Sequence, residues 1–222
     1  MMCPTALPPS TSSSVGDYEA VKIAFIGTHG VGKTTLCYHL AGILKKKLPS
    51  VDIVKEVARA CPLPINRDTN LAAQSWILYS QIAMEIAAQD QHHTVICDRS
   101  VLDNYAYLVH AEGVHPVLDQ LVTYWMETYD YLFKVPVGFV LQRDGVRDMD
   151  SVFQLEIDRL VGDMLNERGL RYYNLSGSNR EIWIAFVVGL VERGDSSSKS
   201  TSALPAPRQM PLPMKPTKPH EI

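Results

Sequence analysis

The segment GTHGVGKT, residues 27–34, combines three glycines with a lysine and two threonines. Glycines let a loop turn its backbone N–H groups inward without Cβ clashes, and a row of such donors at the start of a helix binds phosphate. The spacing fits G-x-x-x-x-G-K-[ST], the pattern of loops that cradle the phosphates of a nucleotide. The segment therefore predicts a site for ATP or GTP.

Individual residues of this loop have distinct expected roles. Lys33 would reach the β- and γ-phosphates, and the Thr34 hydroxyl would hold Mg²⁺. His29 stands at an open position of the pattern, so we expect it to contribute its backbone N–H rather than its ring. The candidate nucleotide-binding residues are Gly27, Thr28, His29, Gly30, Val31, Gly32, Lys33, Thr34 and Thr35.

A second candidate site follows the apolar segment TVIC. There Asp98 and Arg99 end a predicted strand, and the carboxyl ends of parallel strands are where ligands bind in such sheets. The Asp98 carboxylate can share Mg²⁺ with Thr34, directly or through water. Arg99 suits an anionic substrate or product. The alternative is that Asp98 caps a helix and Arg99 is a surface residue.

Two further arginines occur in the polar segment LQRDGVRDMD, ahead of a helix expected from about Ser151. Phosphoryl transfer needs positive charge around the migrating group and a site from which water is excluded. A small lid that carries Arg143 and Arg147 would supply both. The alternative is an ordinary polar loop with surface arginines.

The remaining motifs separate the classes of nucleotide-binding protein. A GTPase needs a D-x-x-G switch and a guanine-reading N-K-x-D, and neither occurs in the chain. An ABC-type ATPase or AAA+ motor needs a longer chain and further motifs. A small kinase needs a phosphate-binding loop, an acid at a strand end and mobile arginines. These elements favour an ATP-dependent kinase.

Around these motifs, predicted strands and helices alternate along the chain. Residues 23–26 are apolar without alternation, as expected for a strand that is buried on both faces. Repeated strand–helix units indicate an α/β fold, a three-layer P-loop NTPase fold with a parallel sheet between helices. Five strands are expected near residues 21–26, 51–55, 93–98, 131–137 and 171–175, and helices near residues 36–47, 69–91, 101–111, 116–128, 151–168 and 179–191.

Composition sets the limits of the folded domain. The chain of 222 residues is 46% hydrophobic, enough for one globular core. Residues 1–17 and 195–222 are rich in Ser and Pro and are expected to be disordered, so residues 18–194 form the predicted domain. The C-terminal tail contains P-x-x-P at residues 213–216 and 216–219, a pattern typical of SH3-type ligands. The simpler alternative is a solvated extension.

Charge and cysteine content argue against other classes. The net charge is −3 and the tail is basic, so the core is acidic and poorly suited to bind nucleic acid in general. The four cysteines have no C-x-x-C spacing, which gives zinc sites and disulfides no support and fits a reducing cytoplasm. The N-terminus lacks the pattern of a secretory signal, and the longest apolar run, residues 182–191, is too short for a membrane span.

The segments GTHGVGKTT, KEVAR, DRSVLDNYAY and DGVRDMD together resemble the P-loop nucleoside and nucleotide kinases. The likeness is to the small AAA-type ATPase and kinase group that includes the kinase domain of ribosylnicotinamide kinases, with deoxynucleoside and thymidylate kinases as more distant relatives. It covers about residues 20–192. It implies a five-stranded parallel sheet of order 2-3-1-4-5, ATP on the loop and a lid after the fourth strand. The two tails have no counterpart in it.

The resemblance also implies an acceptor site. In nucleoside kinases of this type an acid at the end of the second strand takes the proton of the acceptor hydroxyl; Glu56 matches that position, and Asp98 is the competing base. The acceptor would lie between the second strand, the long helix and the segment after DRS. The aromatic candidates there fit a packed core as well. The candidate contacts are Arg59, Gln74, Trp76, Tyr79, Gln81, Arg99, Tyr105 and Tyr107.

The sequence thus predicts a phosphotransferase that moves the γ-phosphoryl group of ATP, with Mg²⁺, to a small nucleoside- or nucleotide-like acceptor. The alternatives are a P-loop ATPase or nucleotide-dependent switch without a small acceptor, and a polynucleotide or RNA kinase. A homodimer and an SH3-type partner of the tail are the candidate assemblies. The predicted catalytic residues are Lys33, Glu56, Asp98, Arg99, Arg143 and Arg147, and the predicted metal ligands are Thr34 and Asp98.

Overall fold

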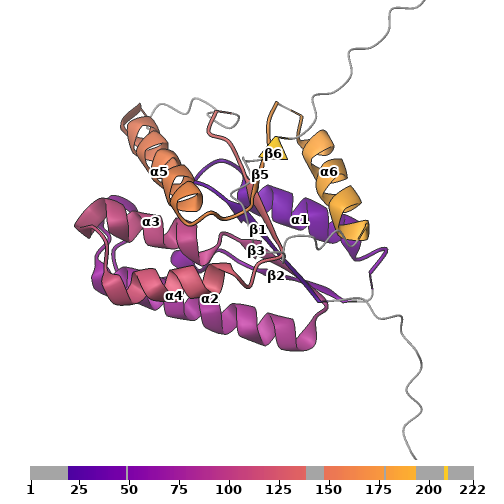
Figure 1. The fold of residues 1–222 in the computed structure, drawn as a ribbon, viewed down its shortest axis with the longest axis horizontal. Helices are drawn as coiled ribbons and strands as arrows, with labels where there is room; N and C mark the ends of the chain where they lie inside the picture. The colour runs from indigo at the N-terminus through magenta and orange to yellow at the C-terminus, as the bar shows by residue number, and fades with distance from the viewer. Residues whose placement is uncertain (1–19, 49, 139–147, 178, 194–207, 210–222) are drawn as a thin grey trace, which may run out of the picture.

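A parallel β-sheet forms the centre of this structure, a computed structural model that describes residues 20–48, 50–138, 148–177, 179–193 and 208–209 (Figure 1). Its strands run in the order β2-β3-β1-β4-β5-β6. The predicted order of five strands, 2-3-1-4-5, is confirmed, and β6 extends the sheet beside β5. The strands are β1 (Val21–Ile26), β2 (Val51–Val54), β3 (Thr94–Asp98), β4 (Tyr131–Lys134), β5 (Tyr173–Asn174) and β6 (Arg208–Gln209).

The short strand β6 comes from the predicted C-terminal tail. Residues Arg208–Gln209 pair in parallel with Tyr173–Asn174, so this part of the segment 195–222 belongs to the sheet. The other residues of that segment, like residues 1–17, lie outside the described part of the chain, and their predicted disorder stays a prediction.

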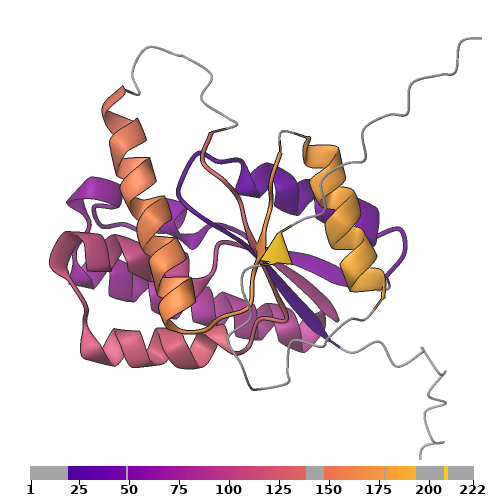
Figure 2. The ribbon, with the colours of Figure 1, turned by 45° about the horizontal axis from the view of Figure 1, so that its top comes forward.

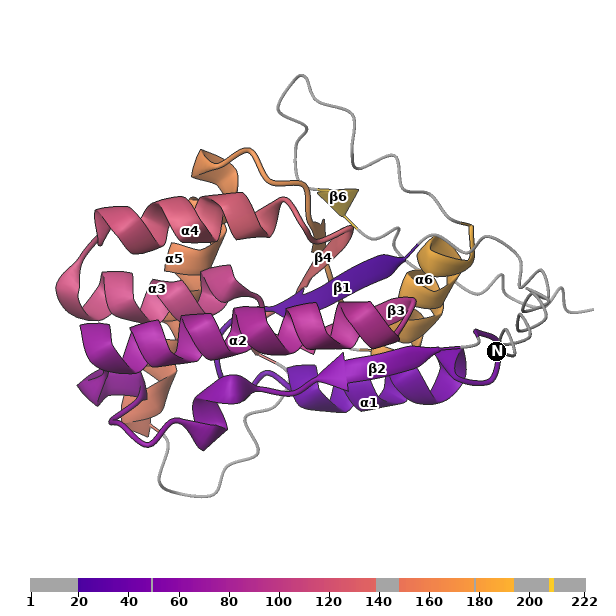
Figure 3. The ribbon, with the colours of Figure 1, turned by 90° about the horizontal axis from the view of Figure 1, so that it is seen from below.

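Helices cover both faces of the sheet, with α1 and α6 on one face and α2, α3, α4 and α5 on the other (Figures 1 and 2). Seen from below, the strand β2 lies between α2 and α1 (Figure 3). This is the predicted three-layer arrangement. Within the described ranges, no helix is long and apolar enough to cross a membrane. The helices are α1 (Lys33–Leu44), α2 (Leu71–Gln91), α3 (Val101–Glu112), α4 (Pro116–Met126), α5 (Asp148–Glu167) and α6 (Arg180–Glu192), with the short 3₁₀ helices η1 (Val57–Ala60) and η2 (Asn66–Asp68).

The strand β1 lies at the centre of the sheet, and its register brings the two predicted motifs together. Ile23 pairs with Ile96 of β3 on one side and with Tyr131 of β4 on the other. In the same register Phe25 pairs with Asp98. The loop after β1 and the polar residues after β3 therefore leave the sheet at the same edge.

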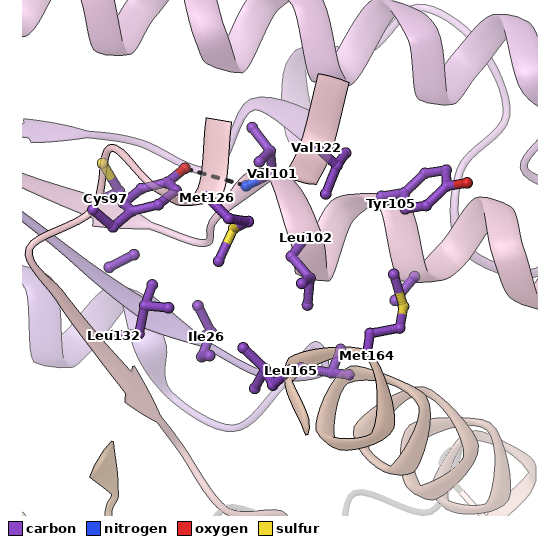
Figure 4. Packing of buried hydrophobic residues seen from close by; sticks show 14 of the residues in the cluster. Ile26, Cys97, Val101, Leu102, Tyr105, Val122, Met126, Leu132, Met164 and Leu165 are labelled. Atoms are coloured by element: carbon purple, nitrogen blue, oxygen red, sulfur yellow. Dashed lines mark hydrogen bonds between the residues drawn. The ribbon is translucent and has the colours of Figure 1, made fainter. Parts of the chain in front are cut away.

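Apolar side chains fill the space between the sheet and the helices on each face. Figure 4 shows the cluster on the α3, α4 and α5 side, where Ile26 and Leu132 of the strands face Leu102 of α3 and Leu165 of α5. On the opposite face, α1 and α6 pack against the sheet in a second cluster that includes the buried Trp183. Burial of β1 on both faces explains why its residues 23–26 are apolar without alternation.

Candidate active site

The loop between β1 and α1 is shaped by glycines and by side chains from two distant helices. Gly32 has φ 90°, in the left-handed region, and α1 begins at the next residue, Lys33, rather than at the predicted Leu36. A Cβ atom at Gly32 would lie 2.6 Å from the guanidinium of Arg180 on α6. One at Gly30 would lie 2.9 Å from the side-chain amide of Gln154 on α5. Gly30 also has a positive φ, 74°, and this backbone conformation favours glycine at both positions.

The early start of α1 places the N–H groups of its first turn at the loop. The first N–H groups of a helix have no intrahelical acceptor, and they carry the positive end of the helix dipole. Those of Lys33, Thr34 and Thr35 are in this position. They are the donors that a phosphate group at this loop would use.

The Lys33 side chain folds back across the loop instead of extending into solvent. Its Nζ donates hydrogen bonds to the carbonyl oxygens of Gly27, at 2.8 Å, and Thr28, at 2.5 Å, and the residue is 4% exposed. Burial and the nearby Arg99 charge lower the pKa of Lys33 from 10.5 to about 7. A triphosphate beside Lys33 would oppose this shift, because a negative charge favours the protonated amine.

Thr34 and Asp98 form the candidate metal site at the edge where β1 and β3 end. Thr34 Oγ1 donates a 2.5 Å hydrogen bond to Asp98 Oδ2. Asp98 is buried, and its Oδ1 has no hydrogen-bond partner among the described residues. A hydroxyl and a carboxylate with an unpartnered oxygen are donor types that Mg²⁺ takes, with phosphate and water completing its shell. The pair therefore fits the predicted magnesium site.

Arg99, next to Asp98, is a buried arginine in an uncommon backbone conformation. Its φ is 91°, in a region that residues other than glycine rarely adopt. Its Nε donates to Glu56 at 2.7 Å, and its Nη1 lies 3.7 Å from Asp103 Oδ2. Its carbonyl oxygen accepts a 3.3 Å hydrogen bond from Gln81 Nε2. Arg99 is 3% exposed, so the alternative of a surface arginine is excluded.

The Glu56 carboxylate lies between two arginines, just after β2. It accepts hydrogen bonds from Arg99 Nε at 2.7 Å and from Arg59 Nε at 2.5 Å. Burial acts to raise the pKa of Glu56, but the Arg99 charge and the hydrogen bonds from both arginines outweigh it and lower the pKa from 4.5 to about 2. Glu56 is thus an anion at neutral pH and a weak proton acceptor, better suited to orient a hydroxyl than to deprotonate it.

Three of the cavities in the described part of the structure meet at Glu56 and Arg59, which line all three. The loop cavity, about 220 Å³, lies along residues 29–35 and reaches Asp98. The polar cavity, about 270 Å³, lies between α2 and α3, and the apolar cavity, about 400 Å³, lies between α1, α2 and β2. The loop cavity and the polar cavity also share Arg99, so a ligand in one would adjoin a ligand in the other.

A family model described as an AAA domain matches residues 22–181. This chain belongs to the AAA domain family. The crystal structure of a thymidylate kinase from Ehrlichia chaffeensis is similar to it, with a TM-score of 0.58 and 18% sequence identity over 78% of this chain and 99% of that chain. The fold is therefore the kinase-like P-loop NTPase fold that the resemblance implied. No curated protein matches the chain.

Two predicted acceptor contacts of this AAA domain lie in its interior instead. Gln81 is fully buried, and its Nε2 donates to Glu85 Oε1 at 2.8 Å. Tyr105 is also fully buried, and its hydroxyl donates to the His115 carbonyl oxygen at 3.3 Å. In the part of the chain that the structure describes, neither residue lines the three cavities. Their prediction as substrate contacts is corrected, because α2 and α3 turn other faces toward the site.

The other predicted catalytic and acceptor residues of the AAA domain divide into two groups. Glu56, Arg59 and Arg99 meet at the cavities, as the sequence led us to expect. Arg143 and Arg147 lie outside the described residues, so the lid and its arginines stay a prediction.

The structure adds contacts that the loop pattern does not contain. The His29 backbone N–H donates to the Tyr107 hydroxyl at 3.1 Å, and the His29 ring lies equally close through Nδ1. The His29 carbonyl accepts a 3.1 Å hydrogen bond from Gln154 Nε2. Tyr107 belongs to α3 and Gln154 to α5. Two further residues from distant helices are Asn104 of α3, at the polar cavity, and Arg180 of α6, at the loop. The sequence carries no local signal for them, because Gln154 is 125 positions from His29.

Proposed function

We propose that this protein is an ATP- and Mg²⁺-dependent phosphotransferase that moves the γ-phosphoryl group to a small nucleoside- or nucleotide-like acceptor. The observation that carries the proposal is the junction of the loop cavity and the polar cavity at Glu56 and Arg99. A nucleotide on the loop and an acceptor in the polar cavity would meet there. The likeness in fold to a thymidylate kinase supports a nucleoside- or nucleotide-like acceptor.

Phosphoryl transfer depends mostly on position and charge, and the site provides groups for both. Lys33 and the first N–H groups of α1 would hold the β- and γ-phosphates. Thr34 and Asp98 would hold Mg²⁺, which neutralises charge on the phosphates when it is bound. Arg99 lies where the loop cavity and the polar cavity join, and it would lie beside the group in transfer. The two arginines of the predicted lid would join it there.

The position of the carboxylates favours Glu56 over Asp98 as the group that contacts the acceptor hydroxyl. Glu56 lines the polar cavity, whereas Asp98 lines the loop cavity and the apolar cavity. One Asp98 oxygen accepts from Thr34, and the other is the oxygen that fits a metal. Glu56 would align the hydroxyl, and alignment matters more than base strength for this chemistry.

Other activities would use parts of the same site. An acceptor-free ATPase or nucleotide-dependent switch would need the loop and the metal pair but not the polar cavity. A polynucleotide or RNA kinase would need a basic groove, whereas the chain has a net charge of −3. The polar cavity beside Glu56 favours the small-molecule kinase.

ADP release with Mg-ATP tests the proposal, first alone and then with nucleosides, nucleoside monophosphates, ribosylnicotinamide and short RNA. We expect strong stimulation by a small acceptor. The variant Lys33→Ala serves as the blank and should abolish transfer, because it removes a contact with the β- and γ-phosphates. Release that needs no acceptor and is absent from the blank would support the ATPase instead. Unchanged turnover in Lys33→Ala would contradict the role of the loop.

A further inference from the structure

Two buried amide groups in the polar cavity carry hydrogen-bonding atoms without a partner. Gln74 of α2 is 3% exposed and Asn104 of α3 is 2% exposed, and both line the cavity. Among the residues that the structure describes, Gln74 Oε1 and Asn104 Nδ2 have no hydrogen-bond partner. Unpartnered buried polar groups are rare in native proteins because they oppose folding, so each calls for an explanation. A ligand in the cavity provides one.

The surroundings decide what each amide offers to such a ligand. Gln74 Nε2 donates a 2.8 Å hydrogen bond to Thr69 Oγ1, which leaves Oε1 as the open acceptor. Asn104 lies in the first turn of α3, which the capping box of Ser100 and Asp103 holds in place. The backbone N–H of Asn104 bonds to the Ser100 carbonyl, and its side-chain N–H group is open. The residues that line the cavity therefore include an unpaired acceptor on α2 and an unpaired donor on α3.

The other walls of the cavity suit a small planar ring. Ile65, Ile77 and Tyr107 line it together with the two amides. Its volume of about 270 Å³ lies just below the usual range for drug-sized ligands, which begins near ~300 Å³. Apolar walls with a few placed polar groups are typical of a small-molecule site.

The arginines at this cavity are already in contact with carboxylates. Arg59 and Arg99 each donate to Glu56, and Arg99 Nη1 lies 3.7 Å from Asp103 Oδ2. The pKa of Glu56, lowered to about 2 because these hydrogen bonds and the Arg99 charge outweigh burial, keeps it an anion at neutral pH. A phosphate monoester carries between one and two negative charges at this pH. Near Glu56 its charge would lie beside a carboxylate of the same sign, which opposes binding.

On the basis of the kinase function proposed above, we propose that the polar cavity takes a nucleoside-like acceptor that carries no phosphate group. Its free hydroxyl lies near Glu56, and the edge of its planar ring donates a hydrogen bond to Gln74 Oε1 and accepts one from Asn104 Nδ2. A nucleobase or a ring with a carboxamide group offers such an edge. The corresponding monophosphate binds more weakly, because its charge would lie beside the Glu56 carboxylate.

Pairs of acceptors that differ only in a phosphate group test whether the substrate carries that phosphate. ADP release by the full chain with Mg-ATP is measured with adenosine, guanosine, cytidine, uridine, thymidine and ribosylnicotinamide, and with the 5′-monophosphate of each. We expect stimulation by a nucleoside and a kcat/KM lower by about 10-fold or more for its monophosphate. Stimulation by monophosphates alone would overturn this inference and leave the kinase function standing. Stimulation by neither kind would overturn both.

Two variants test the amides themselves. Gln74→Met and Asn104→Leu remove them at similar volume, and each should raise the acceptor KM by about 10-fold or more while the KM for ATP stays unchanged. Asn104→Leu should also keep or raise the Tm, because an unpartnered buried amide is lost. Gln91→Met, at an exposed position of α2, is the matched control and should change neither value. An unchanged acceptor KM in both variants, or a lowered Tm in Asn104→Leu, would overturn the assignment.

Discussion

Two buried carboxylate networks lie at opposite ends of β1, and they differ in how completely their hydrogen bonds are paired. At the start of β1, Glu85 accepts hydrogen bonds from Lys22 and Trp125 on Oε2 and from Tyr129 and Gln81 on Oε1, at 2.6–2.9 Å. Lys22 Nζ also lies 4.7 and 4.5 Å from the ring centroids of Trp125 and Tyr129. Lys22 and Glu85 are both fully buried. Both oxygens of this carboxylate are therefore paired within the protein.

At the other end of β1, the network around Arg99 is incomplete. The buried side-chain atoms without a hydrogen-bond partner in the described ranges belong to residues that contact Arg99, follow it in sequence or share its cavity. Gln81 belongs to both networks, because its Nε2 donates to Glu85 and to the Arg99 carbonyl. The Glu85 network is thus closed, with its carboxylate fully paired, and the Arg99 network is open, with several polar atoms unpaired. The residues with unpartnered atoms are Gln74, Gln81, Asp98, Asp103 and Asn104.

Breaking the closed network should have the largest effect. Glu85→Ala leaves the Lys22 ammonium buried without its carboxylate, and loss of one partner of a buried ion pair costs about 3–5 kcal/mol. Urea unfolding measures the change. The double variant Lys22→Met with Glu85→Leu should recover part of the loss, because it leaves no unpaired charge. A loss below about 1 kcal/mol in Glu85→Ala, typical of exposed pairs, would contradict the structural role.

A substitution in the incomplete network around Arg99 should reduce activity more than it reduces the free energy of unfolding. Asp98→Asn removes the charge of the candidate metal ligand but keeps an oxygen for the Thr34 hydroxyl. We expect the Mg²⁺ concentration for half-maximal turnover to rise by about 10–100-fold. The free energy of unfolding should change by less than about 1 kcal/mol. Asp90→Asn, on the exposed side of α2, is the control. An unchanged magnesium requirement in Asp98→Asn would rule out the metal site.

The sequence predicted the parts of these networks that are continuous in the chain. Residues 27–35 and the pair Asp98 and Arg99 were found because fixed spacing reflects a local backbone shape, and parallel register then joins them. Lys22 and Glu85 were not predicted, since 63 positions separate them. Polar and apolar residues of α2 are both buried, so periodicity did not show which face meets the site. We therefore expected Gln81 to contact the acceptor, whereas its side chain lies in the core.

Binding of Mg-ATP should be coupled to protonation of Lys33. The pKa of Lys33 in the free protein is lowered to about 7 by burial and by Arg99, so Lys33 is mostly uncharged at pH 8. A bound triphosphate raises this pKa, so Mg-ATP binding should take up nearly one proton at pH 8 and few at pH 6. Calorimetry in buffers of different ionisation enthalpy measures the uptake, and Lys33→Met should abolish it. Equal uptake at both pH values would contradict the lowered pKa.

Arg59 is an exposed member of the open network, so its substitution should have the smallest effect on stability and activity. Its side chain is 74% exposed, and exposed ion pairs are screened by water, so Arg59→Ala should change the free energy of unfolding by less than about 1 kcal/mol. Glu56 keeps its contact with the buried Arg99 at 2.7 Å and stays charged. In the ADP-release assay, the acceptor KM should rise less than in Asn104→Leu. A loss of stability as large as that of Glu85→Ala would show that Arg59 closes this network as Lys22 closes the other.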